Sequence, residues 1–153
     1  MTEILVIVEH RKKQLTDTSL EVLSKARQLA DEAGYKLIAT VIGRDVIDYT
    51  AKIASWADKV LTLEKEEMED SLAEFCLRPI SWLIKERCPK LVLASNSLFG
   101  MELVPALAME IEAPLATDCT DIRIENDDIR VRRTIYNGKM EAEYSFVPSS
   151  TIL

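Results

Sequence analysis

The feature of this 153-residue sequence that most constrains its fold is a change in the spacing of apolar residues near residue 118. Before that point, short apolar runs alternate with segments whose apolar residues recur at helical spacing. Continuous apolar runs are typical of parallel strands that are covered on both faces. We expect four such strands, at 4–8, 36–42, 59–63 and 91–94. The repeats over 1–117 therefore predict an α/β fold, with an open parallel sheet and helices on both of its faces.

After residue 118 the apolar residues alternate with period two, which is typical of half-buried strands. Strands are expected at 120–124, 129–132 and 140–146. Asn137-Gly138 is a strong signal for a turn between the second and third of these strands, because both of its positions tolerate a positive φ. An antiparallel β-meander over 118–153 is therefore expected to follow the repeats. The last five residues, 149–153, begin another β-like segment, and such an ending is typical of a shortened chain.

Helices are expected between the parallel strands. A capping box at Thr18 and Glu21 predicts the start of the first helix. The next two helices are expected at about 46–56 and 72–83. Pro79 lies inside the later of these and should kink or divide it, because an interior proline costs roughly 3 kcal/mol.

The stretch 95–119 has the most particular pattern, S-N-S-L-F-G-M-E-L-V-P-A-L-A-M-E-I-E-A-P-L-A-T-D-C. A polar loop is expected directly after the fourth strand, where Gly100 would supply backbone freedom. A helix follows, since the apolar residues over 103–111 recur at helical spacing. Pro105 is expected in about the first turn of that helix, where its missing N–H costs least.

Candidate binding residues lie at the carboxyl edge of the predicted sheet, where open α/β sheets bind ligands. Asn96, Ser97 and Gly100 follow the fourth strand, and His10 follows the first. These four are the candidates for contact with a cofactor. The N-termini of the first and fourth helices are also able to attract an anion, although simple helix capping explains the same residues. For His10 the default interpretation is a solvated or capping histidine.

Several kinds of site are excluded by what the sequence lacks. The four glycines are too far apart to form a glycine-rich phosphate loop. His10 is the only histidine and has no Ser or Cys partner at a motif spacing, so no catalytic triad is indicated. Asp118 and Asp121 would point to opposite faces of an extended strand, which argues against a catalytic carboxylate pair. The three cysteines contain no C-x-x-C pair, so neither a disulfide framework nor a metal site is expected.

Length and charge narrow the class of protein further. A chain of 153 residues is expected to form one domain, residues 1–153. Its net charge of −7 would repel a phosphate backbone, so nucleic acid is not an expected partner. The apolar run at 4–8 is too short for a signal peptide or a membrane span. Reduced cysteines indicate a reducing compartment, and we therefore expect the protein in the cytoplasm.

Two separated motifs resemble those of a known family. The pattern N-S-x-x-G-x-E-x-x-P-x-x-A, followed by P-L-x-T-D-C, occupies 96–119, and R-T-x-Y-x-G occupies 133–138. In this order they resemble the N-terminal domain of the α subunit of electron-transfer flavoproteins. The chain departs from the family at Met101, where a basic residue usually follows the glycine.

The resemblance implies a Rossmann-like, adenine-nucleotide-hydrolase-like sheet and a role in electron transfer. Proteins of this family are αβ heterodimers that carry electrons through FAD from dehydrogenases to an acceptor. Their FAD lies mainly in a C-terminal domain of the α subunit, whose G-I-S-G-A-x-Q-H-like signature is absent from these residues. This chain would then be a scaffold in an electron carrier rather than an enzyme. The implied partners are the β subunit, the flavin domain of the α subunit and, indirectly, dehydrogenases.

Three hypotheses remain open from the sequence. The first is this N-terminal domain, the second a stand-alone AMP- or ATP-binding α/β domain, and the third a small enzyme. The missing glycine loop counts against the second, and the missing catalytic residues count against the third. Leu98, Phe99 and Met101 place three apolar side chains in the expected loop, which indicates a partner surface. Packing of Leu98 and Phe99 onto the core is the alternative.

Overall fold

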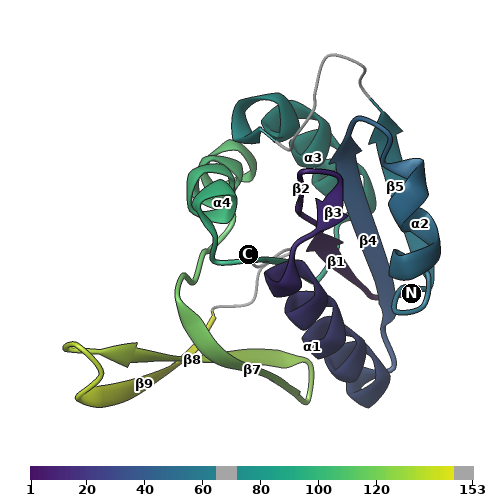
Figure 1. Cartoon of the computed structure of the whole chain (residues 1–153). Helices are drawn as coiled ribbons and strands as arrows, with labels where there is room; N and C mark the ends of the chain where they lie inside the picture. Colours follow the sequence, from purple (N-terminus) through teal and green to yellow (C-terminus); the bar gives the residue numbers. More distant parts are fainter. Residues whose placement is uncertain (65–71, 147–153) are drawn as a thin grey trace.

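The parallel sheet and the β-meander expected from the sequence are both present. The computed structural model describes residues 1–64 and 72–146, so the β-like segment predicted at 149–153 lies outside the described residues. Four parallel strands form a sheet in the order β5-β4-β1-β6 (Figure 1). Their bounds are β1 Glu3–Ile7, β4 Lys36–Gly43, β5 Lys59–Glu64 and β6 Leu91–Ala94. The α/β class is confirmed.

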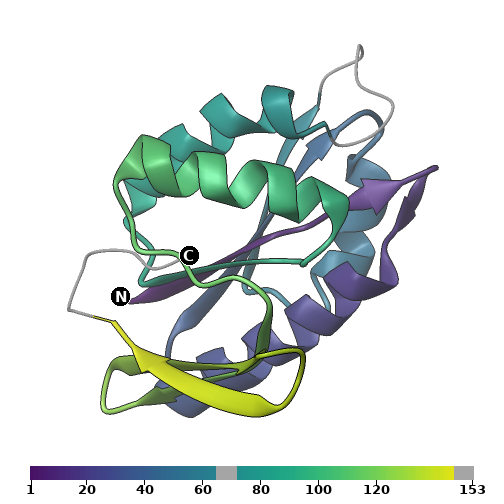
Figure 2. The ribbon, with the colours of Figure 1, turned by 90° about the vertical axis from the view of Figure 1, so that its left-hand side faces the viewer.

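Helices cover both faces of this sheet, as Figure 2 shows from the side. Their bounds are α1 Asp17–Ala33, α2 Ile47–Ile53, α3 Ala73–Arg87 and α4 Leu98–Ile111. Along β1, Ile4 and Val6 join one buried cluster with side chains of α1 and α2. Leu5 and Ile7 join a second cluster with side chains of α3 and α4. The alternation of side chains along a strand thus divides the core into two layers.

The first helix begins earlier than the sequence predicts. Thr16 is its N-cap, and the Thr16 hydroxyl accepts a hydrogen bond from the Ser19 backbone N–H at 3.2 Å. The predicted capping box at Thr18 and Glu21 is therefore wrong. Thr16 is the N-cap because its backbone is extended, as an N-cap requires, whereas Thr18 already lies within the helix.

A small hairpin that the sequence did not predict follows the first strand. It joins β2, His10–Arg11, to β3, Gln14–Leu15, in antiparallel pairing. The turn places Lys12 and Lys13 at φ values of 49° and 59°. Lysine is not a residue that signals positive φ, so the usual turn patterns did not reveal this hairpin.

Helix α4 starts directly at Leu98, so the expected polar loop around Gly100 is absent. Gly100 lies in the first turn of the helix, and a Cβ added to it would lie 1.8 Å from the Ser95 carbonyl oxygen. Glycine is therefore needed for close approach of two backbone segments rather than for conformational freedom. Pro105 lies in the interior of α4 and not in its first turn.

Helix α3 likewise continues through its proline. Pro79 lies inside α3, and the helix is not divided there. Cys76, Ile80 and Ile84 are all buried against the sheet on the same side of the helix. Burial of this apolar face offsets the hydrogen bond that the proline cannot make.

The antiparallel sheet consists of β7 Cys119–Glu125, β8 Asp128–Ile135 and β9 Met140–Ser145. Its tight turn is at Asn126 and Asp127, whose φ values are 51° and 66°. The predicted Asn137-Gly138 turn is present but longer, and Tyr136 there also has a positive φ. Ile129 and Val131 of β8 are buried in the cluster that contains α1. In Figure 1 the far end of the β8–β9 hairpin extends away from the parallel sheet.

Candidate functional site

The carboxyl edge of the parallel sheet is organised around Glu9. The Ser97 hydroxyl donates a hydrogen bond of 2.6 Å to Oε2 of Glu9. Ser97 is also the N-cap of α4, and its hydroxyl oxygen accepts a hydrogen bond from the Gly100 N–H at 3.1 Å. The candidate residues Ser97 and Gly100 are therefore engaged in starting the helix, with a carboxylate placed beside them.

The backbone of Glu9 connects the same edge to α1. Its N–H donates to the Ser19 hydroxyl at 2.8 Å, and the Ser19 hydroxyl donates to the Glu9 carbonyl at 3.1 Å. The Thr16 hydroxyl lies 2.9 Å from that of Ser19. Ser19 is completely buried, so these contacts are shielded from water. Glu9 thus connects the N-termini of α1 and α4.

This arrangement determines which ligands the edge favours. A helix N-terminus attracts negative charge, and here the Glu9 carboxylate already lies at the N-terminus of α4. A phosphate at the same place would meet a like charge and the already capped helix. The edge therefore disfavours the pyrophosphate of a nucleotide.

Asn96 is exposed and contacts a different group. Its side-chain N–H donates to Oδ1 of Asp118 at 3.2 Å. Asp121 instead pairs with Lys25 of α1 at 2.9 Å, and this hydrogen bond holds the pKa of the Asp121 carboxyl below its usual range. The two aspartates have separate partners, and the structure does not bring them together as a pair.

His10 is buried, so the default interpretation of a solvated or capping histidine is wrong. The side chain is 1% exposed, its Nε2 donates to the Ile42 carbonyl at 3.0 Å, and its ring centre lies 5.3 Å from that of Tyr49. A carbonyl can only accept, so Nε2 is the donor in this hydrogen bond. A Cβ at Gly43 would lie 2.2 Å from this nitrogen, which explains the glycine. The contacts of His10 lie with β4 and α2, whereas Asn96 contacts Asp118.

A cavity of about 900 Å³ lies beside β6. Its walls come from β6, α4, α1 and the start of β7, and they include Ser95, Asn96 and Gly100. Cys119 also lines it, and burial raises the pKa of that thiol, partly opposed by the Arg133 charge. The cavity wall is mainly apolar, with polar groups near the start of α4.

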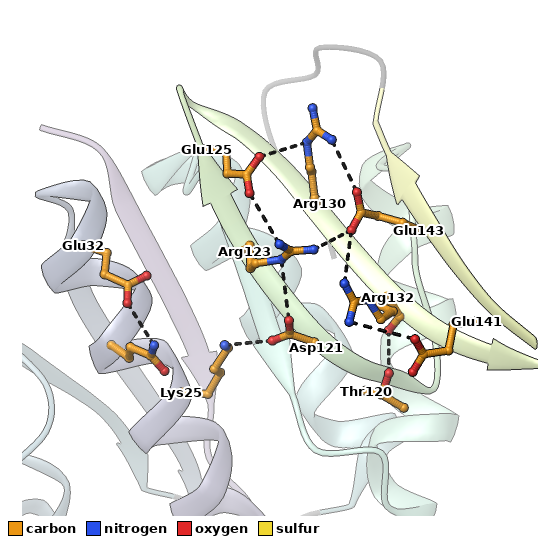
Figure 3. A network of polar contacts seen from close by, with 11 residues as sticks. Lys25, Glu32, Thr120, Asp121, Arg123, Glu125, Arg130, Arg132, Glu141 and Glu143 are labelled. Carbon is orange, nitrogen blue, oxygen red and sulfur yellow. Dashed lines mark hydrogen bonds and ion pairs between the residues drawn. The ribbon is translucent and has the colours of Figure 1, made fainter. Parts of the chain in front are cut away.

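The outer face of the meander carries a network of ion pairs, drawn in Figure 3. Arg123 pairs with Glu143, and Arg130 pairs with both Glu125 and Glu143. These side chains are more than one-third exposed, so each pair contributes little to stability. The network pairs opposite charges across the three strands of this face. Sequence reasoning did not find it, because the pairing depends on the register of β7, β8 and β9.

Residues 1–64 and 72–146 contain no group of three His, Cys, Asp or Glu side chains able to hold a metal ion. None of their helices is long and apolar enough to cross a bilayer.

Comparisons with known proteins identify relatives over the whole length of the chain. Residues 4–153 match the family model described as the electron transfer flavoprotein domain. The chain is 30% identical over 142 residues to an electron transfer flavoprotein subunit alpha of Clostridium acetobutylicum, covering 91% of this chain and 42% of the relative. It is 28% identical over 153 residues to that of Methylophilus methylotrophus, covering 100% of this chain and 48% of the relative. A protein FixB of Clostridium saccharobutylicum is 29% identical over 141 residues, 91% of this chain and 42% of its own. The chain therefore spans less than half the length of each of these relatives.

Proposed function

The chain belongs to the electron transfer flavoprotein domain family, and from this membership we propose that it is the N-terminal domain of an α-type subunit. Its proposed role is that of a scaffold in an FAD-dependent electron carrier between dehydrogenases and an acceptor. The observation that carries this proposal is the family match over 4–153, together with α subunits of about twice the length among the relatives.

The residues of this chain do not fit the pyrophosphate of FAD at the carboxyl edge of the sheet. Ser97 and Gly100 are engaged in capping α4, and the Glu9 carboxylate lies on the cap. We therefore place the FAD of the complex on the rest of the α subunit and its partner, and assign no FAD-binding residue here. The proposed contribution of this domain is to position other parts of the complex rather than to perform chemistry.

The proposed partner surface includes the first turn of α4. Leu98 is 80% exposed and Met101 is 54% exposed, although both are large apolar residues. Phe99 between them is half-buried and packs against the core cluster of α3 and α4. Of the three residues that the sequence predicted for a partner surface, Phe99 thus packs on the core, and Leu98 and Met101 are the two exposed enough to contact a partner.

The far end of the meander offers a second exposed apolar group. Tyr136, Met140 and Tyr144 of the β8–β9 hairpin are 72%, 56% and 44% exposed. Exposed apolar side chains grouped on one projecting element are typical of interaction sites. We propose that this hairpin and the start of α4 contact the β subunit or the remainder of the α subunit.

Co-purification with the cognate β subunit tests this proposal. The chain should co-purify with that subunit when both are expressed together, and the chain alone should be colourless. Stoichiometric flavin absorbance from the isolated chain would contradict the placement of FAD elsewhere. Failure to associate with the β subunit, both alone and as part of a full-length α subunit, would contradict the scaffold role.

A further inference from the structure

The two faces of the β-meander differ in composition. Side chains alternate along each strand, so directly opposed residues of neighbouring strands share a face. Arg132 and its neighbour Glu143 lie on the outer face and belong to the ion-pair network of Figure 3. On the inner face, β8 contributes Val131, Arg133 and Ile135, and the residues opposite them on β9 are Tyr144, Ala142 and Met140. Arg133 is the one charged residue among these six.

The rest of the protein covers only part of the inner face. Val131 is buried in the cluster that contains α1, whereas Tyr144 directly opposite it is 44% exposed. Towards the far end of the hairpin Met140 is 56% exposed. This end extends away from the parallel sheet in Figure 1. We call the part beyond Val131 the inner meander face, and it consists of Arg133, Ile135, Met140, Ala142 and Tyr144.

Arg133 lacks the partner that a partly buried cation needs. In the part of the chain that the structure describes, Arg27, Arg130 and Arg133 each have a buried Nε without a hydrogen bond. The guanidinium groups of Arg27 and Arg130 nevertheless pair with carboxylates. Arg133 pairs with none within 1–64 and 72–146, and its one hydrogen bond there, from Nη1 to Oγ1 of Thr117, is 3.5 Å long. A half-buried cation with unused donors favours an anion beside it.

We propose that the inner meander face docks onto the β subunit, and that a carboxylate of that subunit binds Arg133 between the apolar side chains. This inference rests on the proposed function and deepens it by naming the chemistry of the partner surface. A guanidinium binds a carboxylate through two parallel N–H···O hydrogen bonds, so it selects an Asp or Glu side chain.

The composition and position of the face agree with such a docking site. Arginine, tyrosine and methionine are enriched in the cores of protein interfaces, and Arg133, Tyr144 and Met140 lie together here. The hairpin extends away from the core of its own domain, and we therefore assign the occupant to the separate chain.

The substitution Arg133→Met distinguishes a charged partner surface from an apolar one. If the β subunit offers a carboxylate, methionine leaves that carboxylate buried without a partner, and binding weakens. If the partner surface is purely apolar, methionine removes an unpaired cation, and binding is unchanged or tighter. We expect the Kd for the β subunit to rise at least about thirtyfold, which corresponds to about 2 kcal/mol, the low end of the loss for truncating one member of a buried charge pair.

Two further variants serve as controls in the same calorimetric titration. Arg132→Met changes the neighbouring arginine on the outer face, whose ion pairs are exposed, and should alter the Kd by less than about threefold. Tyr144→Ser removes an exposed apolar side chain of the inner meander face and should weaken binding whatever the charge of the partner. The melting temperature of the free chain should be unchanged in Arg133→Met, because Arg133 has no carboxylate partner there.

Titration of the cognate β subunit with the chain and with the full-length α subunit tests the proposal. Unchanged or tighter binding of Arg133→Met, with Tyr144→Ser weakened, would overturn the carboxylate and leave the proposed function intact. Unchanged binding in both variants, or a large fall in the melting temperature of the free Arg133→Met chain, would overturn the docking site. A fall in the melting temperature of the full-length subunit alone would assign the face to the remainder of that subunit and overturn the proposal too. Failure of both unsubstituted proteins to bind the β subunit would overturn the proposed function and this inference with it.

Discussion

The Ser97 hydroxyl donates a 2.6 Å hydrogen bond to the Glu9 carboxylate and so joins the segment after β1 to the start of α4. The two residues are far apart in the sequence and meet only because β1 and β6 are neighbours in the sheet. The contact places a negative charge where the unpaired N–H groups of α4 attract one. The edge at which related architectures bind ligands is, in this domain, engaged by the protein itself.

Glu9→Gln should destabilise the domain by about 1 kcal/mol, because it removes a charge-assisted hydrogen bond and a charge at a helix N-terminus. Urea unfolding at low salt measures the difference in free energy. Glu102→Gln alters an exposed carboxylate on the same helix and should have a smaller effect. Equal losses in the two variants would show that the Ser97 contact has no special role.

AMP and ATP should bind weakly or not at all, because their phosphates would meet the Glu9 carboxylate at the N-terminus of α4. A ligand present at 100 times its dissociation constant stabilises a fold by about 2.7 kcal/mol, which is readily visible as a melting shift. We expect no shift at millimolar concentrations of either nucleotide. A dose-dependent rise of several degrees would support the nucleotide-binding hypothesis instead.

Gly100→Ala should destabilise the domain by about 1–3 kcal/mol, although alanine is the better helix former. The added Cβ would lie 1.8 Å from the Ser95 carbonyl oxygen, which is backbone and cannot move alone. Gly34→Ala is the control, because its Cβ meets nothing within 4 Å and its cost is limited to the strain of φ +69°. A neutral or stabilising Gly100→Ala would contradict the close approach of the two backbones.

Alkaline pH should weaken the contact between the meander and the parallel sheet. Tyr35 donates a 2.5 Å hydrogen bond to Asp127, and burial, with this contact, raises the pKa of Tyr35 to about 12 from 10.0. The folded state therefore holds this proton more tightly than the unfolded state does. Its contribution to stability is fully present below pH 10 and is lost as the pH rises to about 12.

Tyr35→Phe tests this pH dependence. The variant should be less stable than the unsubstituted protein at pH 8, and the difference should shrink between pH 10 and 12 in urea unfolding. Because lysines titrate in both proteins, only the difference between the two is informative. A constant difference over this range would show that the Tyr35 proton is not linked to folding.

Leu98→Ser combined with Met101→Ser should reduce association with the β subunit and leave the melting temperature unchanged, because both side chains are exposed. Phe99→Ser should instead lower stability, since Phe99 packs against the core. Met109→Ser, at a residue 81% exposed near the other end of α4, is the matched control for association. Unchanged association in the double variant would exclude this turn from the partner surface.

The spacing of apolar residues was enough to predict the layers of the fold. The bounds of β6 agree with the predicted strand at 91–94, because a buried parallel strand requires an uninterrupted apolar run. The meander was likewise predicted from its period of two, since Ile129 and Val131 of β8 are buried in the cluster that contains α1, whereas the residues between and beside them are more accessible. These features depend on neighbours within one element, and the sequence displays them directly.

The roles of Gly100 and Pro105 were misjudged because they depend on where α4 starts. A loop glycine and a helical glycine look alike in a sequence, and only the nearby Ser95 carbonyl shows which one is present. The sequence predicted a loop from polar residues at 95–97, which instead supply the N-cap of a helix that begins at once.

The sequence by itself determined the strand and helix periods and the two motifs through which the family was recognised, because local patterns carry that information. Only the tertiary structure decided that Glu9 accepts a hydrogen bond from Ser97 and that His10, at the start of the β2–β3 hairpin, is buried. It also decided that Phe99 belongs to the core while Leu98 and Met101 do not. Each of these outcomes depends on contacts between residues that are far apart in the sequence. Such contacts follow from the order of the strands and the packing of the helices, which no local pattern specifies.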